Sequence, residues 1–123
     1  MTSLPLGSNS ATHAYMRGSR LSGENWSAQD LRGANLVMAN LEAVVLDDAR
    51  LTDAHLHGCR LRKASLARGT LNNVQARDAD FESANLCQAS LTGADLRGAV
   101  LFEANLQGAN LAGANLQGAD LRR

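Results

Sequence analysis

The chain has 123 residues, and its 12 Lys and Arg residues balance 12 Asp and Glu residues, so its formal net charge is zero. This length predicts one domain with one core, and the zero net charge argues against a non-specific nucleic-acid binder, which needs a long-range positive field. Cys59 and Cys87 form no CxxC pair, and no apolar segment is long enough for a secretory leader or a membrane span, so we expect a cytoplasmic chain with neither a disulfide nor a zinc site.

The first segment, residues 1–18, is expected to be an N-terminal arm or cap. Residues 1–13 contain Pro5 and many Ser, Thr and Asn residues, which favours a flexible arm or a lid over the structure that follows. The stretch at 14–18 shares the phase of the repeats that come after it and is expected to be a degenerate repeat.

From residue 19 to residue 123 the chain repeats with a period of five. Of the 20 leucines, 19 occupy one phase, which we call the centre, and Trp26, Ala76 and Phe81 fill that phase where leucine is missing between residues 21 and 121. Two residues before the centre, the alanine slot holds Ala in 14 of 18 repeats between residues 34 and 119. Two residues after the centre, the corner holds nine of the 11 glycines. The residue just before the centre, the Asx slot, is often Asn or Asp, whose side chains bond to nearby backbone in turns.

A period of five fits neither a helix nor a continuous strand. Along a helix the leucines would spread over all sides, and along a strand they would alternate between the two faces. The pattern fits a coil in which each repeat contributes a short extended segment followed by a turn. The centre and the alanine slot would then face a common interior.

The motif A(N/D)LxG, as at residues 104–108 and 114–118, resembles the pentapeptide repeat family over residues 19–123. The resemblance implies an all-β fold, a right-handed quadrilateral parallel β-helix of about five coils, with four repeats in each coil. Charges supply an independent test, because residues stacked one coil apart should be complementary. At a separation of 20 residues, only Arg77 and Arg97 are alike, and six pairs are opposite in charge: Asp30 with Arg50, Glu42 with Arg62, Asp48 with Arg68, Arg60 with Asp80, Arg62 with Glu82, and Glu103 with Arg123.

Two local departures from the pattern carry predictions about the interior. Polar residues fill the alanine slots at positions 19, 24 and 29, which predicts an irregular first coil around Trp26. Further along, one centre shrinks to Ala76, and we expect Val74 and Phe81 to fill the space that it vacates.

No motif in the sequence indicates catalysis, a cofactor or a metal. His55 and His57 flank Leu56 and should point outward, but the residues predicted above and below them offer no good third ligand, so ordinary surface histidines are expected. Cys59 falls in an alanine slot and is expected in the core, whereas Cys87 should point outward. We therefore expect a protein that is not an enzyme and that binds no cofactor.

One side of the predicted coil carries 10 of the 24 charged residues and is the candidate partner surface. We call it the charged side; its centres lie at residues 41 to 121 in steps of 20. Two of its outward residues are apolar and would form an anchor among charges. The alternative is that these charges only pair between coils and keep the protein soluble. The candidate surface comprises Glu42, Arg60, Arg62, Lys63, Asp80, Glu82, Val100, Phe102 and Glu103.

The regular repeats run to Leu121, which would leave the edge of the last coil open. Such edges are normally covered. Some members of the pentapeptide repeat family dimerise end to end, so we hypothesise a homodimer through the C-terminal end of the coil.

The resemblance leaves two functions open. The first is a bacterial, cytoplasmic interaction module that presents a rigid surface to a protein partner, with neither nucleic acid nor membrane as its target. The alternative is a DNA mimic that binds a topoisomerase such as DNA gyrase. Mimicry of DNA needs a strongly acidic surface, and the zero net charge disfavours it.

Overall fold

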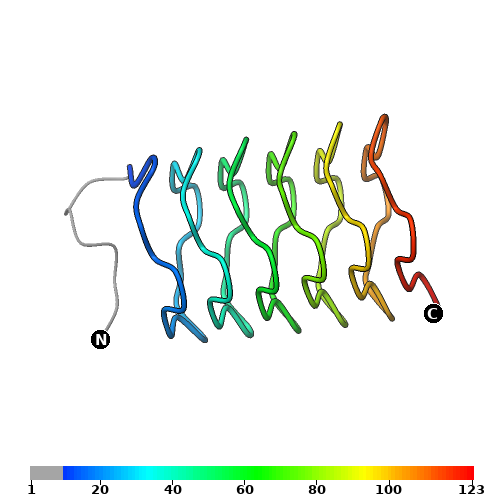
Figure 1. The fold of residues 1–123 in the computed structure, drawn as a ribbon, viewed down its shortest axis with the longest axis horizontal. Coiled ribbons are helices and arrows are strands. Elements are labelled where there is room, and N and C mark those ends of the chain that lie inside the picture. The colour runs from blue at the N-terminus through cyan, green and yellow to red at the C-terminus, as the bar shows by residue number, and fades with distance from the viewer. Residues whose placement is uncertain (1–9) are drawn as a thin grey trace.

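The structure is a computed structural model that describes residues 10–123, and it shows a coil whose turns stack along one long axis (Figure 1). The first described coil, in blue, lies at one end of the stack, and the C-terminus, in red, lies at the other. Within residues 10–123 there is no helix. The extended elements are single bridged residues at every fifth position from Ser10 to Asp120, each in an Asx slot.

Parallel bridges join residues that lie 20 apart in the sequence. They run from the pair Ser10 and Asp30 to the pair Val100 and Asp120. Because each repeat has five residues, this separation places four repeats in each coil. The predicted fold, a right-handed quadrilateral parallel β-helix of about five coils, is confirmed.

Each repeat contains one hydrogen-bonded turn. The amide of the alanine slot donates to the carbonyl oxygen of the preceding centre, as Ala34 does to Leu31 at 3.0 Å. The corner residue between them has a φ of 57° to 62° in 13 non-glycine residues and of 63° to 73° in nine glycines. This left-handed conformation costs a residue such as Ala43 about 1–2 kcal/mol but costs glycine nothing, which explains why glycine gathers at the corners.

Backbone hydrogen bonds join each coil to its neighbours. The amides of the centre and the corner donate forward, as Leu41 does to the carbonyl of Arg60 at 2.7 Å and Ala43 does to that of Arg62 at 2.9 Å. The amide of the Asx slot donates backward, as Arg60 does to Ala39 at 3.0 Å. Between residues 31 and 100, only the residue just after the centre has an amide that makes no backbone bond.

Side chains bind many of these remaining amides. Where the Asx slot holds Asn or Asp, its Oδ1 accepts from the amide two residues later, as Asn35 does from Val37 at 3.1 Å. Where that slot holds Ser65, the acceptor comes from the previous coil: Oδ1 of Asp47 accepts from the amide of Ala67 at 3.1 Å. The preference for Asn and Asp before the centre therefore follows from the hydrogen bonding of the turn.

The interior is filled by the centres and the alanine slots. Every centre from Leu21 to Leu101 is at most 3% exposed, and no polar or charged residue in the described part of the chain is buried. Each buried leucine contributes about 1.5–3 kcal/mol before conformational entropy is counted. Ala76, Val74 and Phe81 are all fully buried; that the two larger side chains fill the space beside Ala76 stays a prediction.

The described coil begins at Ser10, earlier than the expected boundary at residue 19. Ser10 bridges Asp30, and Tyr15, in the degenerate repeat, bridges Asn35. The corners of this first coil have the same positive φ as the later ones, at 57° to 73°. Its alanine slots differ from the later ones, because Ser19, Glu24 and Gln29 are only partly buried, whereas the alanine slots from Ala34 to Ala99 are buried. An N-terminal arm or cap remains a proposal for residues 1–9, which lie outside the described part of the chain.

Candidate partner-binding surfaces

The register places the nine residues of the candidate surface on one side, over four consecutive coils. The Asx slots of this side form one row, in which Arg60 bridges Asp80 and Asp80 bridges Val100. Arg62 and Glu82, just after the centres of two adjacent coils, form an ion pair at 2.8 Å. The role of this side in binding a partner stays a prediction.

Phe102 is less exposed than the predicted anchor. The ring is half-buried, as is Val100, and the guanidinium of Arg122 lies 5.6 Å from the ring centroid. Arg122 is itself held by Asp120, with 2.7 Å between Nη2 and Oδ2. A stacked cation of this kind contributes about 0.5–1 kcal/mol at an exposed site. The expected exposed aromatic residue is therefore a ring partly covered by a guanidinium.

Charges pair between coils at only some of the predicted positions. Three of the predicted pairs form no ion pair in residues 10–123: Glu42 with Arg62, Arg60 with Asp80, and Glu103 with Arg123. Several charges of the charged side therefore have no ion-pair partner in the described residues. The predicted pairs that do form are Asp30 with Arg50 at 3.8 Å, Asp48 with Arg68 at 2.9 Å, and Arg62 with Glu82 at 2.8 Å.

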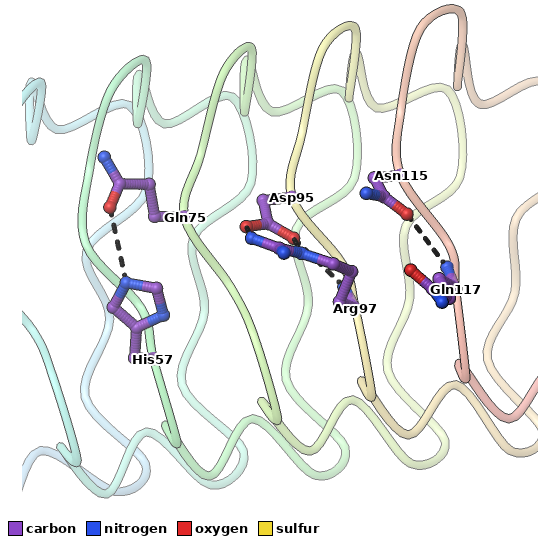
Figure 2. Close-up of polar contacts among 6 residues, drawn as sticks. All are labelled: His57, Gln75, Asp95, Arg97, Asn115 and Gln117. Carbon is purple, nitrogen blue, oxygen red and sulfur yellow. Dashed lines mark hydrogen bonds and ion pairs between the residues drawn. The ribbon is translucent and has the colours of Figure 1, made fainter.

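A second kind of ion pair was not predicted from the sequence. Asp95 and Arg97 flank an inward leucine and form an ion pair at 2.5 Å, which Figure 2 shows from outside the coil. The hydrogen bond from Arg97 lowers the pKa of Asp95 to about 2. The same Asp-Leu-Arg sequence recurs at 30–32 and 120–122, where the same pair forms at 2.7 Å. This recurring tripeptide was the signal that could have revealed the pairing.

Another side of the coil carries the most exposed large apolar side chains. We call it the histidine side; its centres lie at residues 16 to 116 in steps of 20. In the described part of the chain, the exposed large hydrophobic residues are Tyr15 at 75%, Met38 at 60% and Leu121 at 47%, and the first two lie on this side. Neither was predicted as an exposed apolar residue, although the five-residue phase already places both outside the core.

The two histidines of this side are surface residues with polar neighbours. Nε2 of His57 lies 3.3 Å from Oε1 of Gln75, in the next coil (Figure 2). His55 lies in the row of bridged residues, between Asn35 and Gln75. Among residues 10–123, no three His, Cys, Asp or Glu residues group in a way that could hold a metal ion.

The two cysteines are free thiols in different surroundings. Cys59 is buried in the core, as predicted, and its Sγ donates to the carbonyl oxygen of Leu36. Burial raises the pKa of the Cys59 thiol to about 12. Cys87 is partly exposed on another side of the coil. Of the two, only Cys87 is accessible to a reagent in the folded protein.

The C-terminal end of the coil is an open edge. The amides of Leu106, Leu111 and Leu116 donate in none of the backbone bonds of residues 10–123. A shallow hollow of about 830 Å³ lies at this end, between Leu101 and Leu121. Residues 104–119 carry no charge, so the rim of the last coil is polar and neutral on three sides.

One solved structure with a TM-score above 0.5 supports the fold, and two more are similar to this chain in sequence. The structure of Rfr23, a pentapeptide repeat protein from the cyanobacterium Cyanothece 51142, is 25% identical to this chain with a TM-score of 0.53, and the match covers 95% of this chain and 93% of that one. HetL, from Nostoc sp. strain PCC 7120 and involved in the regulation of heterocyst differentiation, is 27% identical with a TM-score of 0.49, over 90% of this chain and 69% of that one. A pentapeptide repeat protein from the thylakoid lumen of Arabidopsis thaliana is 30% identical with a TM-score of 0.47, over 85% and 66%.

Comparison by sequence leads to the same family. No curated protein matches the chain. In the part of the chain that the structure describes, no helix is long and apolar enough to cross a membrane. The model of pentapeptide repeats matches eight copies, at residues 12–48, 45–82 and 79–118. The chain belongs to the pentapeptide repeat family.

Proposed function

We propose that this protein is a non-enzymatic interaction module that presents the charged side of a rigid coil to a protein partner in the cytoplasm. The observation that carries the proposal is the filled interior, in which every centre from Leu21 to Leu101 is at most 3% exposed. Small-molecule sites are usually deep, largely apolar cavities. A coil packed with side chains offers its outer sides instead.

The charged side supplies the groups that would recognise a partner. Arg60 and Lys63 form no ion pair in residues 10–123, and neither does Glu103. Charges of both signs in fixed positions give specificity and a faster encounter with a complementary surface. Phe102, under the guanidinium of Arg122, adds an aromatic contact near these charges.

Affinity capture from the native cytoplasm tests this surface. We expect wild-type protein to capture a partner that Lys63→Glu and Phe102→Ala, separately, recover at least tenfold less, which corresponds to about 1.4 kcal/mol of binding free energy. Asp53→Lys is the control, because it reverses an exposed corner charge on another side of the coil. Equal recovery of the same proteins by all four forms would refute the proposed surface.

We also propose a homodimer through the C-terminal coil. The amides of Leu106, Leu111 and Leu116 lack backbone acceptors in the described chain, and Leu121 is 47% exposed. A second copy stacked on this edge would bury the leucines and pair the amides. Light scattering at micromolar concentration should give twice the chain mass of 13.0 kDa, and Leu121→Asp should restore the monomer. A monomer mass for the wild type contradicts the dimer.

The charge balance is the basis for ranking the DNA mimic second. The chain carries 12 basic and 12 acidic residues, and Arg60, Arg62 and Lys63 gather in one coil of the charged side. Such a surface does not imitate the uniform negative charge of a DNA duplex. In a supercoiling assay with DNA gyrase and a quinolone, we expect no protection by low micromolar protein; protection would reverse the ranking.

A further inference from the structure

We propose that the histidine side is a second docking surface, which binds an extended acidic peptide of a partner protein with an apolar side chain of that peptide seated against Met38. This surface lies on a different side of the coil from the charged side, so it does not depend on the function proposed above. Its evidence consists of exposed apolar groups, a cleft beside them and the charges that border the cleft.

Exposed apolar side chains occupy two adjacent coils of this side. Tyr15 is 75% exposed and Met38 is 60% exposed. Tyr15 bridges Asn35, which lies in the same repeat as Met38, so the two apolar residues belong to neighbouring coils. Tyrosine and methionine are enriched in protein interfaces, and large apolar groups exposed close together mark interaction sites.

A shallow cleft lies beside Met38. It has a volume of about 400 Å³ and is lined by Met38, His57, Gly58, Arg77 and Asp78. The methionine side chain extends over Gly58, where any larger residue would collide with its Sδ atom. Glycine at this corner thus makes room for Met38, and the thioether forms one wall of a cleft that could receive an apolar side chain.

The charges that border the cleft are of both signs, since Arg77 and Asp78 line it and Asp95 and Arg97 lie in the next coil. Arg77 forms no ion pair in residues 10–123. In the next coil, Arg97 donates two hydrogen bonds to Asp95, at 2.8 and 2.5 Å, and so neutralises that carboxylate. The carboxylate of Asp78 extends toward Gly98, in the following coil and away from Met38. Arg77 is therefore the cation without an ion pair near Met38, and it favours a partner that carries a carboxylate.

The spacing of the coils sets the spacing of the peptide. Arg77 lies in the coil two beyond that of Met38, and coils stack about 4.8 Å apart, so the backbones of the two residues are roughly 10 Å apart along the axis. An extended chain advances about 3.3 Å per residue. A peptide that runs along the axis would therefore place an apolar residue and an acidic residue about three positions apart.

Fluorescence anisotropy at low salt tests this proposal with two labelled peptides. The probe is a ten-residue peptide with two leucines, each followed three residues later by glutamate, and the matched peptide has lysine in place of glutamate. We expect the acidic peptide to bind wild-type protein at least tenfold more tightly than the lysine peptide. Arg77→Glu and Met38→Ser should each weaken binding of the acidic peptide at least tenfold, which is about 1.4 kcal/mol.

Lys63→Glu is the control, because it makes the same charge reversal on the charged side and should change the affinity less than twofold. The substituted side chains are exposed, so we expect all variants to keep the wild-type circular dichroism spectrum; Arg77→Gln replaces Arg77→Glu if the latter does not fold. Equal binding of both peptides, no binding at millimolar protein, or an unchanged affinity in the Arg77 variant would overturn the proposal. So would a preference for a single-stranded oligonucleotide over the acidic peptide.

Discussion

In many repeats, Asn or Asp in the Asx slot accepts a hydrogen bond from the one backbone amide that has no backbone acceptor. Oδ1 of Asn85 accepts from the amide of Cys87 at 3.0 Å. In the repeat that begins with Ser90, the acceptor is instead Asn72 of the previous coil, which binds the amide of Thr92 at 3.2 Å. The amide just after the centre thus finds a side-chain acceptor either within its own repeat or in the previous coil.

Removal of one such acceptor should lower stability by the value of one hydrogen bond. We expect Asn85→Ala to reduce the free energy of unfolding by about 1 kcal/mol, because the amide of Cys87 loses its acceptor. Urea unfolding followed by circular dichroism measures the change. Gln107→Ala, at an exposed position just after a centre, is the control, and an equal effect of the two substitutions would argue against the role of the Asx slot.

The two thiols should differ in reactivity. At pH 8 a disulfide reagent should modify Cys87 and leave Cys59 intact, because Cys59 is buried and its pKa is raised to about 12. Mass spectrometry should find one modified thiol in the native protein and two in urea. In Cys87→Ser the native protein should not react, and modification of Cys59 without denaturant would show that the core opens there.

At the scale of the repeat, the Asp-Leu-Arg pairs should make the coil sensitive to acid. The hydrogen bonds from Arg97 and Arg122 lower the pKa of Asp95 and of Asp120 to about 2. Carboxyl groups with a lowered pKa stabilise the fold above their unfolded pKa of about 4, and this stability is lost as the pH falls toward 2.

A thermal melt as a function of pH tests this pairing. The melting temperature should fall between pH 4 and pH 2, and Asp95→Asn should reduce that fall, because one of the carboxyl groups with a lowered pKa no longer titrates. Because Asp95 is only partly buried, the effect is expected to shrink in high salt. An identical fall in the variant and the wild type would show that Asp95 contributes nothing.

The small centre at Ala76 tests how the interior is packed. If Val74 and Phe81 fill the space beside it, Ala76→Leu overpacks the core and should lower the free energy of unfolding by about 1–3 kcal/mol. Leu71→Ala, in the same coil, should cost about 2–5 kcal/mol by leaving a cavity. A stabilised Ala76→Leu protein would mean that the space is empty.

The coil could be predicted from the sequence because its period is set by packing. Leucine at the centre and alanine two residues before it must both face inward, and charges such as Asp48 and Arg68 then show which residues stack. The exposure of the surface could not be predicted in the same way. The cover over Phe102 depends on the rotamer of Arg122, and a five-residue phase says that Met38 points outward but not that its neighbours leave it 60% exposed.

At the scale of the whole molecule, each coil contacts only its neighbours, as in other solenoids. Stability should therefore be lowest at the ends, and the C-terminal end has unpaired amides and exposed leucines. Two sides of the coil present different kinds of side chain. One has charges of both signs around Phe102, and the other has Tyr15 and Met38 beside Arg77.

Native-state amide hydrogen exchange, measured residue by residue by NMR, tests the central claim most directly. Between residues 31 and 100, four amides in each repeat bond to backbone carbonyls, and the amide just after the centre does not. We predict slow exchange at those four amides and faster exchange at the amide just after the centre. The difference should be smallest in repeats where an Asn or Asp side chain accepts a hydrogen bond from that amide. Contiguous protected stretches without a five-residue period would contradict the fold.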